Sequence, residues 1–256
     1  MDSDGGVMTT LDTDLAGTWV RRWDAQQELY VADREERFAV IGDVVEHALD
    51  GRTGTVLDLG CGPGSLSGRL AARLPGSRIV GLDSDPLLLA LAQARYGDTV
   101  EFVDADLGTD AWPEQVPPVL DAAVSTTALH WLAPDQLAEV YRKLGTLLRP
   151  GGVFVDGDHR GLGDPALDAL ARRVRDARAA RAGVTDHEDW ETWWDAVRAD
   201  PTLTELLGQR SARAVAHRPE STPVIGRQTD LLRAAGFAGV GPVWQSGDDF
   251  VLVGIR

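Results

Sequence analysis

The sequence contains a single cysteine, Cys61, among 256 residues. One cysteine excludes an intrachain disulfide and a zinc site built from several thiolates. No apolar run approaches the roughly 20 residues that a membrane-spanning helix needs. Positive charge is also scarce, because 25 lysines and arginines stand against 40 acidic residues, for a net charge of −15. This balance argues against a nucleic acid or an anionic membrane as the partner.

Length and composition are those of one domain. With 43% apolar residues, the chain can bury one core and still carry a cap or an insertion. Residues 1–10 are acidic and lack the basic-then-apolar pattern of a secretion signal. We interpret them as a disordered tail and expect a cytoplasmic protein. No pattern indicates the oligomeric state.

A glycine turn is the most informative motif. Residues 56–59 read as a buried strand, and a helix is predicted over residues 65–74. Between them, Gly60, Gly62 and Gly64 allow the backbone to turn sharply and to approach a ligand closely. The first amides of the following helix would then point toward that ligand.

Two features of this turn argue against a dinucleotide. The sixth position of a dinucleotide fingerprint is glycine, and here it is Ser65. Asp58 stands just before the turn, where it would repel a pyrophosphate and suit a cation. S-adenosylmethionine carries an ammonium and a sulfonium, so it fits both observations. Within the turn, Cys61 reads as a small residue that fills a tight space, with a reactive nucleophile as the alternative.

Strand-like and helix-like segments alternate along the chain, which predicts an α/β fold with a parallel sheet covered by helices. The predicted strands are residues 55–59, 78–82, 100–103, 120–125, 153–155, 240–244 and 250–255. Further predicted helices are residues 34–49, 87–95, 135–148 and 230–235, the last with Thr229 as its N-cap.

Residues 160–226 interrupt this alternation. They contain only helical segments, at about 164–182, 189–199 and 202–216. We expect a helical cap, inserted before the last two strands and lying over the carboxyl ends of the others, where open α/β sheets bind ligands. The chain would then be one domain with a cap insertion.

Two more acidic residues follow predicted strands. Asp83 ends the second strand about twenty residues beyond the glycine turn, where a carboxylate can accept both ribose hydroxyls. Asp106 follows the third strand and can accept a hydrogen bond from an adenine amino group, with Leu107 packing on the ring. Asp85 reads as a helix cap and Asp104 as a solvated residue.

These motifs together resemble those of the class I S-adenosylmethionine-dependent methyltransferases. The matching segments are Val56–Leu70, Val80–Pro86, Phe102–Leu107, Leu120–Leu132 and Leu148–Val155. The resemblance implies a Rossmann-like seven-stranded sheet, mostly parallel with the last strand antiparallel, and S-adenosylmethionine as the cofactor. It also implies that the three glycines frame the methionine portion, and we place Ser84 and Thr126 beside them in the cofactor site.

A narrower resemblance concerns the trans-aconitate methyltransferase group. It is carried by Trp23-Asp24, by Tyr30–Arg37 and by Ala128–Leu132. In that group an N-terminal helix covers the cofactor, so residues 1–50 are expected to form the tail and covering helices. The resemblance implies that Arg37 meets the cofactor carboxylate. It ends after residue 155, so it does not imply trans-aconitate as the substrate.

Two histidines are candidates for catalysis. Methyl transfer from a sulfonium mainly requires an acceptor held in line behind the methyl group, and a general base matters only where the acceptor arrives protonated. His130 and His159 follow the fourth and fifth strands, at the expected cleft. Each is either a general base or a hydrogen-bonded structural imidazole.

Aromatic and basic residues are candidates for the substrate site. Trp190, Trp193 and Trp194 share one face of a predicted helix, and Trp131 follows His130. We expect Trp131, Trp190 and Trp194 to contact a planar substrate, with packing inside the cap as the alternative. Arginines between residues 172 and 181 read as a solvated helix face or as an anchor for an acidic substrate.

The sequence therefore predicts an S-adenosylmethionine-dependent methyltransferase that acts on an O, N or C nucleophile of a small molecule. The alternative is an enzyme that uses the same cofactor for cyclisation or rearrangement. A binding subunit without activity is a third possibility, which the intact Asp58, Asp83 and Asp106 disfavour.

Overall fold

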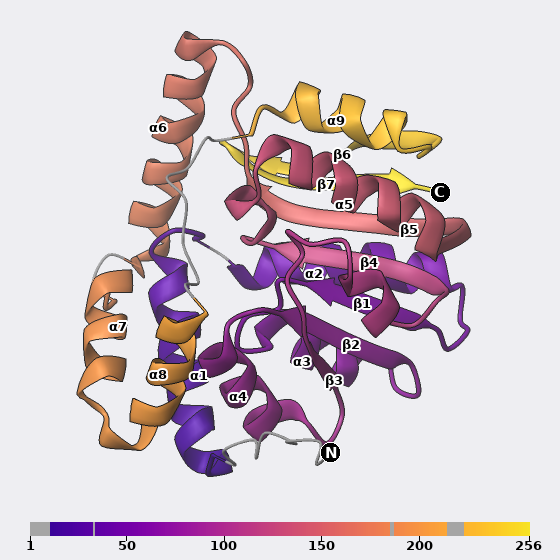
Figure 1. Ribbon diagram of the computed structural model, residues 1–256. Coiled ribbons are helices and arrows are strands. Elements are labelled where there is room, and N and C mark those ends of the chain that lie inside the picture. Colours follow the sequence, from indigo (N-terminus) through magenta and orange to yellow (C-terminus); the bar gives the residue numbers. More distant parts are fainter. Residues whose placement is uncertain (1–10, 33, 185–186, 214–222) are drawn as a thin grey trace.

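The computed structural model describes residues 11–32, 34–184, 187–213 and 223–256. The predicted tail, residues 1–10, and the end of the predicted helix 202–216 lie outside these described residues. A central sheet lies between two layers of helices, and a group of further helices stands beside one end of the strands (Figure 1).

The described residues form a seven-stranded sheet in the order β3-β2-β1-β4-β5-β7-β6. Strands β1 to β5 pair in parallel with their neighbours, whereas β7 is antiparallel to both β5 and β6. This confirms the predicted mostly parallel, Rossmann-like sheet. The strands are β1 (Thr55–Leu59), β2 (Arg78–Asp83), β3 (Glu101–Asp104), β4 (Leu120–Thr126), β5 (Leu148–His159), β6 (Gly239–Ser246) and β7 (Asp249–Ile255).

Helices cover both faces of this sheet. α2 (Arg34–Leu49) and α3 (Ser65–Arg73) pack on one face, and α5 (Pro134–Leu147) and α9 (Ile225–Ala234) pack on the other. The remaining helices are α1 (Thr13–Glu28), α4 (Pro86–Tyr96), α6 (Pro165–Ala182), α7 (Trp190–Ala199) and α8 (Thr204–Ala212), with short 3-10 turns η1 (Trp112–Gln115), η2 (Leu129–Trp131) and η4 (Pro201–Leu203).

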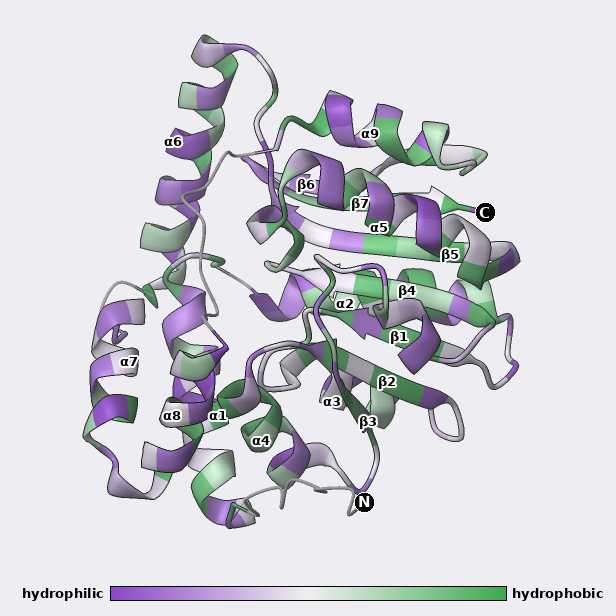
Figure 2. Cartoon of the chain, viewed as in Figure 1, coloured by the Kyte–Doolittle hydropathy of each residue, from purple (hydrophilic) through white to green (hydrophobic). Residues whose placement is uncertain are grey.

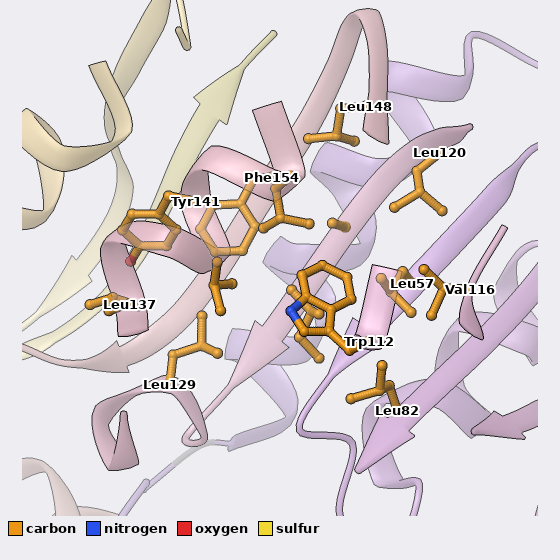
Figure 3. Packing of buried hydrophobic residues seen from close by; sticks show 14 of the residues in the cluster. Leu57, Leu82, Trp112, Val116, Leu120, Leu129, Leu137, Tyr141, Leu148 and Phe154 are labelled. Atoms are coloured by element: carbon orange, nitrogen blue, oxygen red, sulfur yellow. The ribbon is translucent and has the colours of Figure 1, made fainter. Parts of the chain in front are cut away.

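Two apolar cores lie on opposite faces of the sheet, because successive side chains of a strand point to opposite sides. In β1, Leu57 belongs to one core and Val56 to the other. Figure 3 shows the first core, where Trp112, Tyr141 and Phe154 fill the space between the sheet and α5. Hydrophobic colour runs along β2 and β4 in the middle of the sheet (Figure 2).

A third core joins the N-terminal helix to the cap. Trp19 and Trp23 of α1 pack against Trp193 of α7, with ring centroids 5.7 and 5.0 Å apart. Leu88 of α4 and Leu206 of α8 complete this cluster. The N-terminal helix and the cap helices α7 and α8 therefore pack together on α4.

The structure differs from the predicted elements in several places. β5 ends at His159, so His159 is its last residue rather than one that follows it, and α8 begins at Thr204 after the 3-10 turn η4. β5 begins at Leu148, five residues earlier than predicted, and its pairing with β4 is irregular between Leu120 and Ala122. α1 had no prediction of its own. The prediction that Thr229 caps the last helix is wrong, because α9 begins at Ile225 and the Thr229 hydroxyl donates to the Ile225 carbonyl 2.8 Å away inside the helix.

Within the part of the chain that the structure describes, no helix has both the length and the apolar character that crossing a membrane requires.

Candidate active site

One cavity of about 1640 Å³ opens at the carboxyl ends of the parallel strands. Residues after β1, β2, β3, β4 and β5 line it, and α1, α6 and α7 contribute side chains from the other side. Because the strand order reverses between β1 and β4, this is the crevice in which open α/β sheets bind ligands. Among the predicted residues, the lining includes Gly60, Cys61, Gly62, Asp83, Ser84, Asp106, Leu107, Thr126, His130, Trp131, His159 and Trp190.

The glycine turn after β1 lines the middle of the cavity. Gly60, Gly62 and Gly64 have φ angles of 68°, 54° and 83°, a region that side chains disfavour. A Cβ atom on Gly60 would lie 2.5 Å from Cβ of Ala128, whereas one on Gly62 would meet nothing nearer than 3.9 Å. Gly60 thus has no room for a side chain, whereas a Cβ on Gly62 would make only ordinary contacts with Trp23 and Leu88. Gly64 does not line the cavity and instead begins α3.

Asp83 connects the glycine turn after β1 to the turn after β2 through hydrogen bonds. Its Oδ2 accepts a hydrogen bond of 2.7 Å from the Gly62 amide. Its Oδ1 accepts from the amides of Ser84 and Asp85, at 2.8 and 2.9 Å. Burial raises the pKa of Asp83 to about 6, against the opposing effect of these hydrogen bonds. The carboxylate is thus held rigidly at the cavity wall, in the place predicted for the ribose acid.

Asp58 lies beneath the turn and does not line the cavity. It is 1% exposed, and its Oδ2 accepts a 2.6 Å hydrogen bond from the Ser67 hydroxyl. Burial raises its pKa to about 7, and the nearby charge of Asp83 acts in the same direction. A cation in the cavity would therefore meet Asp83 directly and Asp58 only through the intervening turn.

Replacing Asp58 by asparagine is expected to stabilise the free protein at alkaline pH. The pKa of Asp58 is raised from 3.8 to about 7, so the folded chain keeps a proton that the unfolded chain releases, and stability falls as pH rises through this window. The gain should be about 1–2 kcal/mol, or roughly 2–4 °C in Tm per kcal/mol. Differential scanning fluorimetry of both proteins at pH 5 and pH 8 measures it. An equal Tm difference at both pH values would contradict this explanation.

Cys61 is 8% exposed and lines the cavity within the turn. Burial and the neighbouring charges of Asp83 and Asp58 raise the pKa of its thiol well above the usual value. Because the thiolate is the reactive form, this environment favours the reading of Cys61 as a small residue that fills space.

The acid after β3 is exposed and stays on the cavity rim. Oδ1 of Asp106 accepts a 2.7 Å hydrogen bond from the Gly108 amide, and Leu107 is half-buried beside it. Asp104, the last residue of β3, forms an ion pair of 2.5 Å with Arg213 of the cap. The adenine end predicted from the sequence is thus bordered by a cap residue that sequence reasoning missed.

Arg37 lies outside the cavity lining. Its side chain is fully buried, pairs with Asp249 at 2.5 Å and donates to the Gly157 carbonyl at 3.2 Å. Arg34, one helical turn earlier on α2, lines the cavity and pairs with Asp24 at 2.5 Å. The i, i+3 spacing of these arginines was the available signal that a second guanidinium shares the helix face.

The end of β4 carries backbone strain. Thr127 has a φ of 50°, one of two positive values at non-glycine residues in the described chain. Its amide donates to the Gly157 carbonyl at 3.0 Å, and it lines the cavity beside Thr126. The Thr126 hydroxyl accepts from Arg37 at 3.3 Å. Such strain costs about 1–3 kcal/mol and concentrates at functional sites.

His130 and Asp158 form a pair inside the cavity. Nδ1 of His130 lies 2.8 Å from Oδ2 of Asp158, and the two side chains are 14% and 4% exposed. Burial alone would raise the pKa of Asp158, but the charge and the hydrogen bond of His130 hold that pKa well below its usual value. An ionised carboxylate therefore orients the imidazole, and sequence reasoning missed it because β4 and β5 meet only in the fold.

His159 has a different environment. Its Nε2 lies 3.0 Å from the carbonyl oxygen of Tyr30, and its Nδ1 lies 3.5 Å from Oδ1 of Asp248. Both ring nitrogens thus face groups of the protein, and they join the N-terminal segment to the turn between β6 and β7. This arrangement supports the structural reading of His159 more than the catalytic one.

Some of the predicted tryptophans line the cavity, and others are buried in the third apolar core. Trp190 and Trp131 line the cavity, whereas Trp193 and Trp194 are 0% and 4% exposed within the third core. Trp23 of α1 also lines the cavity, 5.3 Å from Trp190 between ring centroids. The aromatic wall is therefore shared by two helices, and only part of it follows from the helical spacing within α7.

The arginines of α6 divide in the same way. Arg172 and Arg175 line the cavity, and Arg175 forms an ion pair of 2.9 Å with Asp248. Arg178 lies away from the cavity, 5.1 Å from the centroid of Trp244.

Comparison with known proteins agrees with this geometry. Residues 56–152 match a family model described as a methyltransferase domain. The trans-aconitate 2-methyltransferase of Azoarcus sp. is 36% identical over 159 residues, which are 62% of this chain and 59% of that protein. The chain thus covers little more than half the length of that relative.

Two further proteins extend the comparison. The trans-aconitate 2-methyltransferase of Methylobacterium nodulans is 32% identical over 68% of this chain and 67% of its own length. An O-methyltransferase family protein from Burkholderia thailandensis has a solved structure with a TM-score of 0.55 at 18% identity, over 94% of this chain and 72% of that one. The second similarity shows the shared fold. The chain belongs to the class I S-adenosylmethionine-dependent methyltransferases, near the trans-aconitate 2-methyltransferases.

Proposed function

We propose that this protein transfers the methyl group of S-adenosylmethionine to an O, N or C nucleophile of a small molecule. The observation that carries the proposal is a single cavity that is lined both by the glycine turn and Asp83 and by the His130–Asp158 pair. The sequence prediction of a cytoplasmic enzyme stays a prediction.

The residues present fit the cofactor. Gly60 has no room for a Cβ atom, and both Gly60 and Gly62 bring bare backbone to the cavity wall. Asp83 and Asp106 are acceptors of the kind that ribose hydroxyls and an adenine amino group need. Arg34 can meet the carboxylate of the methionine portion. The cofactor supplies an electrophilic methyl group on a sulfonium, which is already a good leaving group.

The chain's own residues then provide a base and a dry, shaped site. When Nδ1 of His130 carries the proton that Asp158 accepts, Nε2 is the basic nitrogen of the ring and can take a proton from the acceptor. The paired rings of Trp23 and Trp190 contribute an apolar wall that excludes water. Asp158 keeps the imidazolium paired after the proton arrives.

Methyl transfer has a direct test. The protein is incubated with methyl-labelled S-adenosylmethionine and a metabolite extract, and both products are quantified by mass spectrometry. The proposal predicts one S-adenosylhomocysteine for each labelled small molecule. Consumption of the cofactor without S-adenosylhomocysteine would instead indicate cyclisation or rearrangement, and label in macromolecules would contradict a small-molecule acceptor.

The methyl acceptor should differ from trans-aconitate, the tricarboxylate after which the relatives are named. On the wall formed by α6, the carboxylates of Asp168 and Asp176 accompany Arg172 and Arg175. Arg175 is already paired with Asp248. A trianion would therefore meet about as much negative as positive charge and would lose its hydration without compensation.

Trans-aconitate is accordingly expected not to bind measurably at millimolar concentration. Isothermal titration into the protein saturated with S-adenosylhomocysteine measures this binding, and titration of S-adenosylhomocysteine into the same preparation shows that the site is intact. A trans-aconitate Kd in the micromolar range would contradict the electrostatic argument.

A further inference from the structure

The cap reaches the nucleoside end of the cavity as well as the acceptor end. α8 packs beside α4, to the left of the strands in Figure 1, and Arg210 of α8 forms an ion pair of 2.6 Å with Asp85. The Arg210 guanidinium also lies 4.2 Å from the centroid of Trp194 in α7. One residue thus joins two cap helices to the loop after β2.

Asp85 connects this ion pair to the predicted ribose acid. Its amide donates to Oδ1 of Asp83 at 2.9 Å. Its own Oδ1 accepts from the amides of Leu87 and Leu88, at 3.0 and 3.3 Å, and so caps α4. Oδ2 is the atom that Arg210 holds. Any displacement of Asp85 would therefore disturb both α4 and the position of the Asp83 carboxylate.

The Arg210–Asp85 ion pair is more shielded from water than its neighbour. The side chains of Asp85 and Arg210 are 4% and 21% exposed, so water screens their attraction only weakly. The neighbouring pair between Arg213 and Asp104 has side chains that are 44% and 47% exposed, and such exposed pairs contribute little. Among the described residues, Arg210 is therefore the less exposed of the two cap arginines that pair with acids at this edge of the sheet.

We propose that Arg210 is a positioning residue for the cofactor and that its ion pair with Asp85 governs cofactor release. Through Asp85 it fixes the loop that carries Asp83, and it holds α8 against the nucleoside end of the cavity. The cofactor leaves when this ion pair opens. The inference rests on the S-adenosylmethionine site described above, but not on the identity of the acceptor.

The test measures dissociation of S-adenosylhomocysteine by stopped-flow displacement with the whole chain. Arg210→Gln is expected to increase the dissociation rate about tenfold or more, because breaking a desolvated ion pair acts mainly on dissociation. Arg210→Lys should restore slow release in large part, since an ammonium can still pair with Asp85. Asp85→Ser removes the charge but keeps a good helix N-cap, so it should match Arg210→Gln.

Two comparisons separate positioning from a loss of stability. Arg198→Gln is the matched control, because the ion pair that the structure describes for Arg198 lies within α7, with Asp195, and both side chains are exposed. The double variant Arg210→Gln/Asp85→Ser should release the product no faster than either single variant. Melting temperatures of the free proteins show whether the cap remains folded.

The outcomes are distinct. Dissociation rates within twofold of the parent in Arg210→Gln and Asp85→Ser would overturn the proposal, as would additive effects in the double variant. No binding of S-adenosylhomocysteine to the parent protein would overturn the cofactor site and this inference together. Faster release with a normal methyl-transfer step would support the inference.

Discussion

Replacing His130 by glutamine is expected to lower kcat by about 10²–10⁴-fold, the usual contribution of a general base. Glutamine fills similar space but cannot take up a proton. Asp158→Asn should lower kcat as well, because it removes the charge that orients the imidazole and stabilises its protonated form. The measurement is single-turnover methyl transfer to the acceptor that the labelling experiment identifies, with the cofactor at saturation.

Substitutions at two other histidines test whether the expected loss is specific to His130. His47 is exposed on α2, so His47→Gln is the control for substitution itself. His159→Gln tests the competing candidate, whose ring nitrogens face Tyr30 and Asp248. A full loss of kcat in His159→Gln with normal turnover in His130→Gln would assign the base to His159. Normal turnover in both would mean that the acceptor needs no base.

Replacing Asp83 by asparagine is expected to weaken binding of S-adenosylmethionine about 10- to 100-fold. The carboxylate accepts three backbone hydrogen bonds, from Gly62, Ser84 and Asp85. Asparagine offers one oxygen, so the hydrogen bonds to one of the two turns are lost. The negative charge that favours a cationic ligand also disappears. A hydrogen bond to a charged group contributes about 1.5–3 kcal/mol, which corresponds to this range of Kd. Isothermal titration with cofactor and product measures the loss.

The same carboxylate sets an expected pH dependence. Because the pKa of Asp83 is raised to about 6, the free protein carries this side chain mostly ionised at pH 8 and mostly protonated at pH 5. A cationic ligand favours the ionised form, so cofactor affinity should fall as pH drops through 6. Asp98→Asn, at an exposed position after α4, is the control. An Asp83→Asn variant that keeps the affinity and pH profile of the parent would contradict this role.

Much of the fold was predictable because its signals are local. The glycine turn needs positive φ at Gly60, Gly62 and Gly64, and the sequence shows this need directly. Apolar runs and helix caps gave the order of the elements, including Asp85 as the N-cap of α4. The start of β5 was missed because the residues after Leu148, including two glycines, look like a turn. Leu148 nevertheless pairs with Leu120 of β4, and the register shifts before the pairing resumes at Val153.

The positions of site residues were predictable only where their contacts are made by residues close to them in the chain. Asp83 could be placed because it ends β2 and the amides that donate to its carboxylate lie nearby in the chain. Arg37 could not, because its burial against Asp249 depends on how α2 packs on β7. The division of the tryptophans also depended on packing, since Trp194 shares its helix face with Trp190 but enters a core built with α1.

The sequence by itself determined the order of strands and helices, the glycine turn and the acidic residues that follow β2 and β3. These features depend on backbone conformation and on periodicity, which neighbouring residues specify. Only the tertiary structure decided that His130 meets Asp158, that Arg34 lines the cavity in place of Arg37, and that Arg210 holds Asp85. Such contacts join residues from different elements, and their distances exist only after the sheet and the cap have packed.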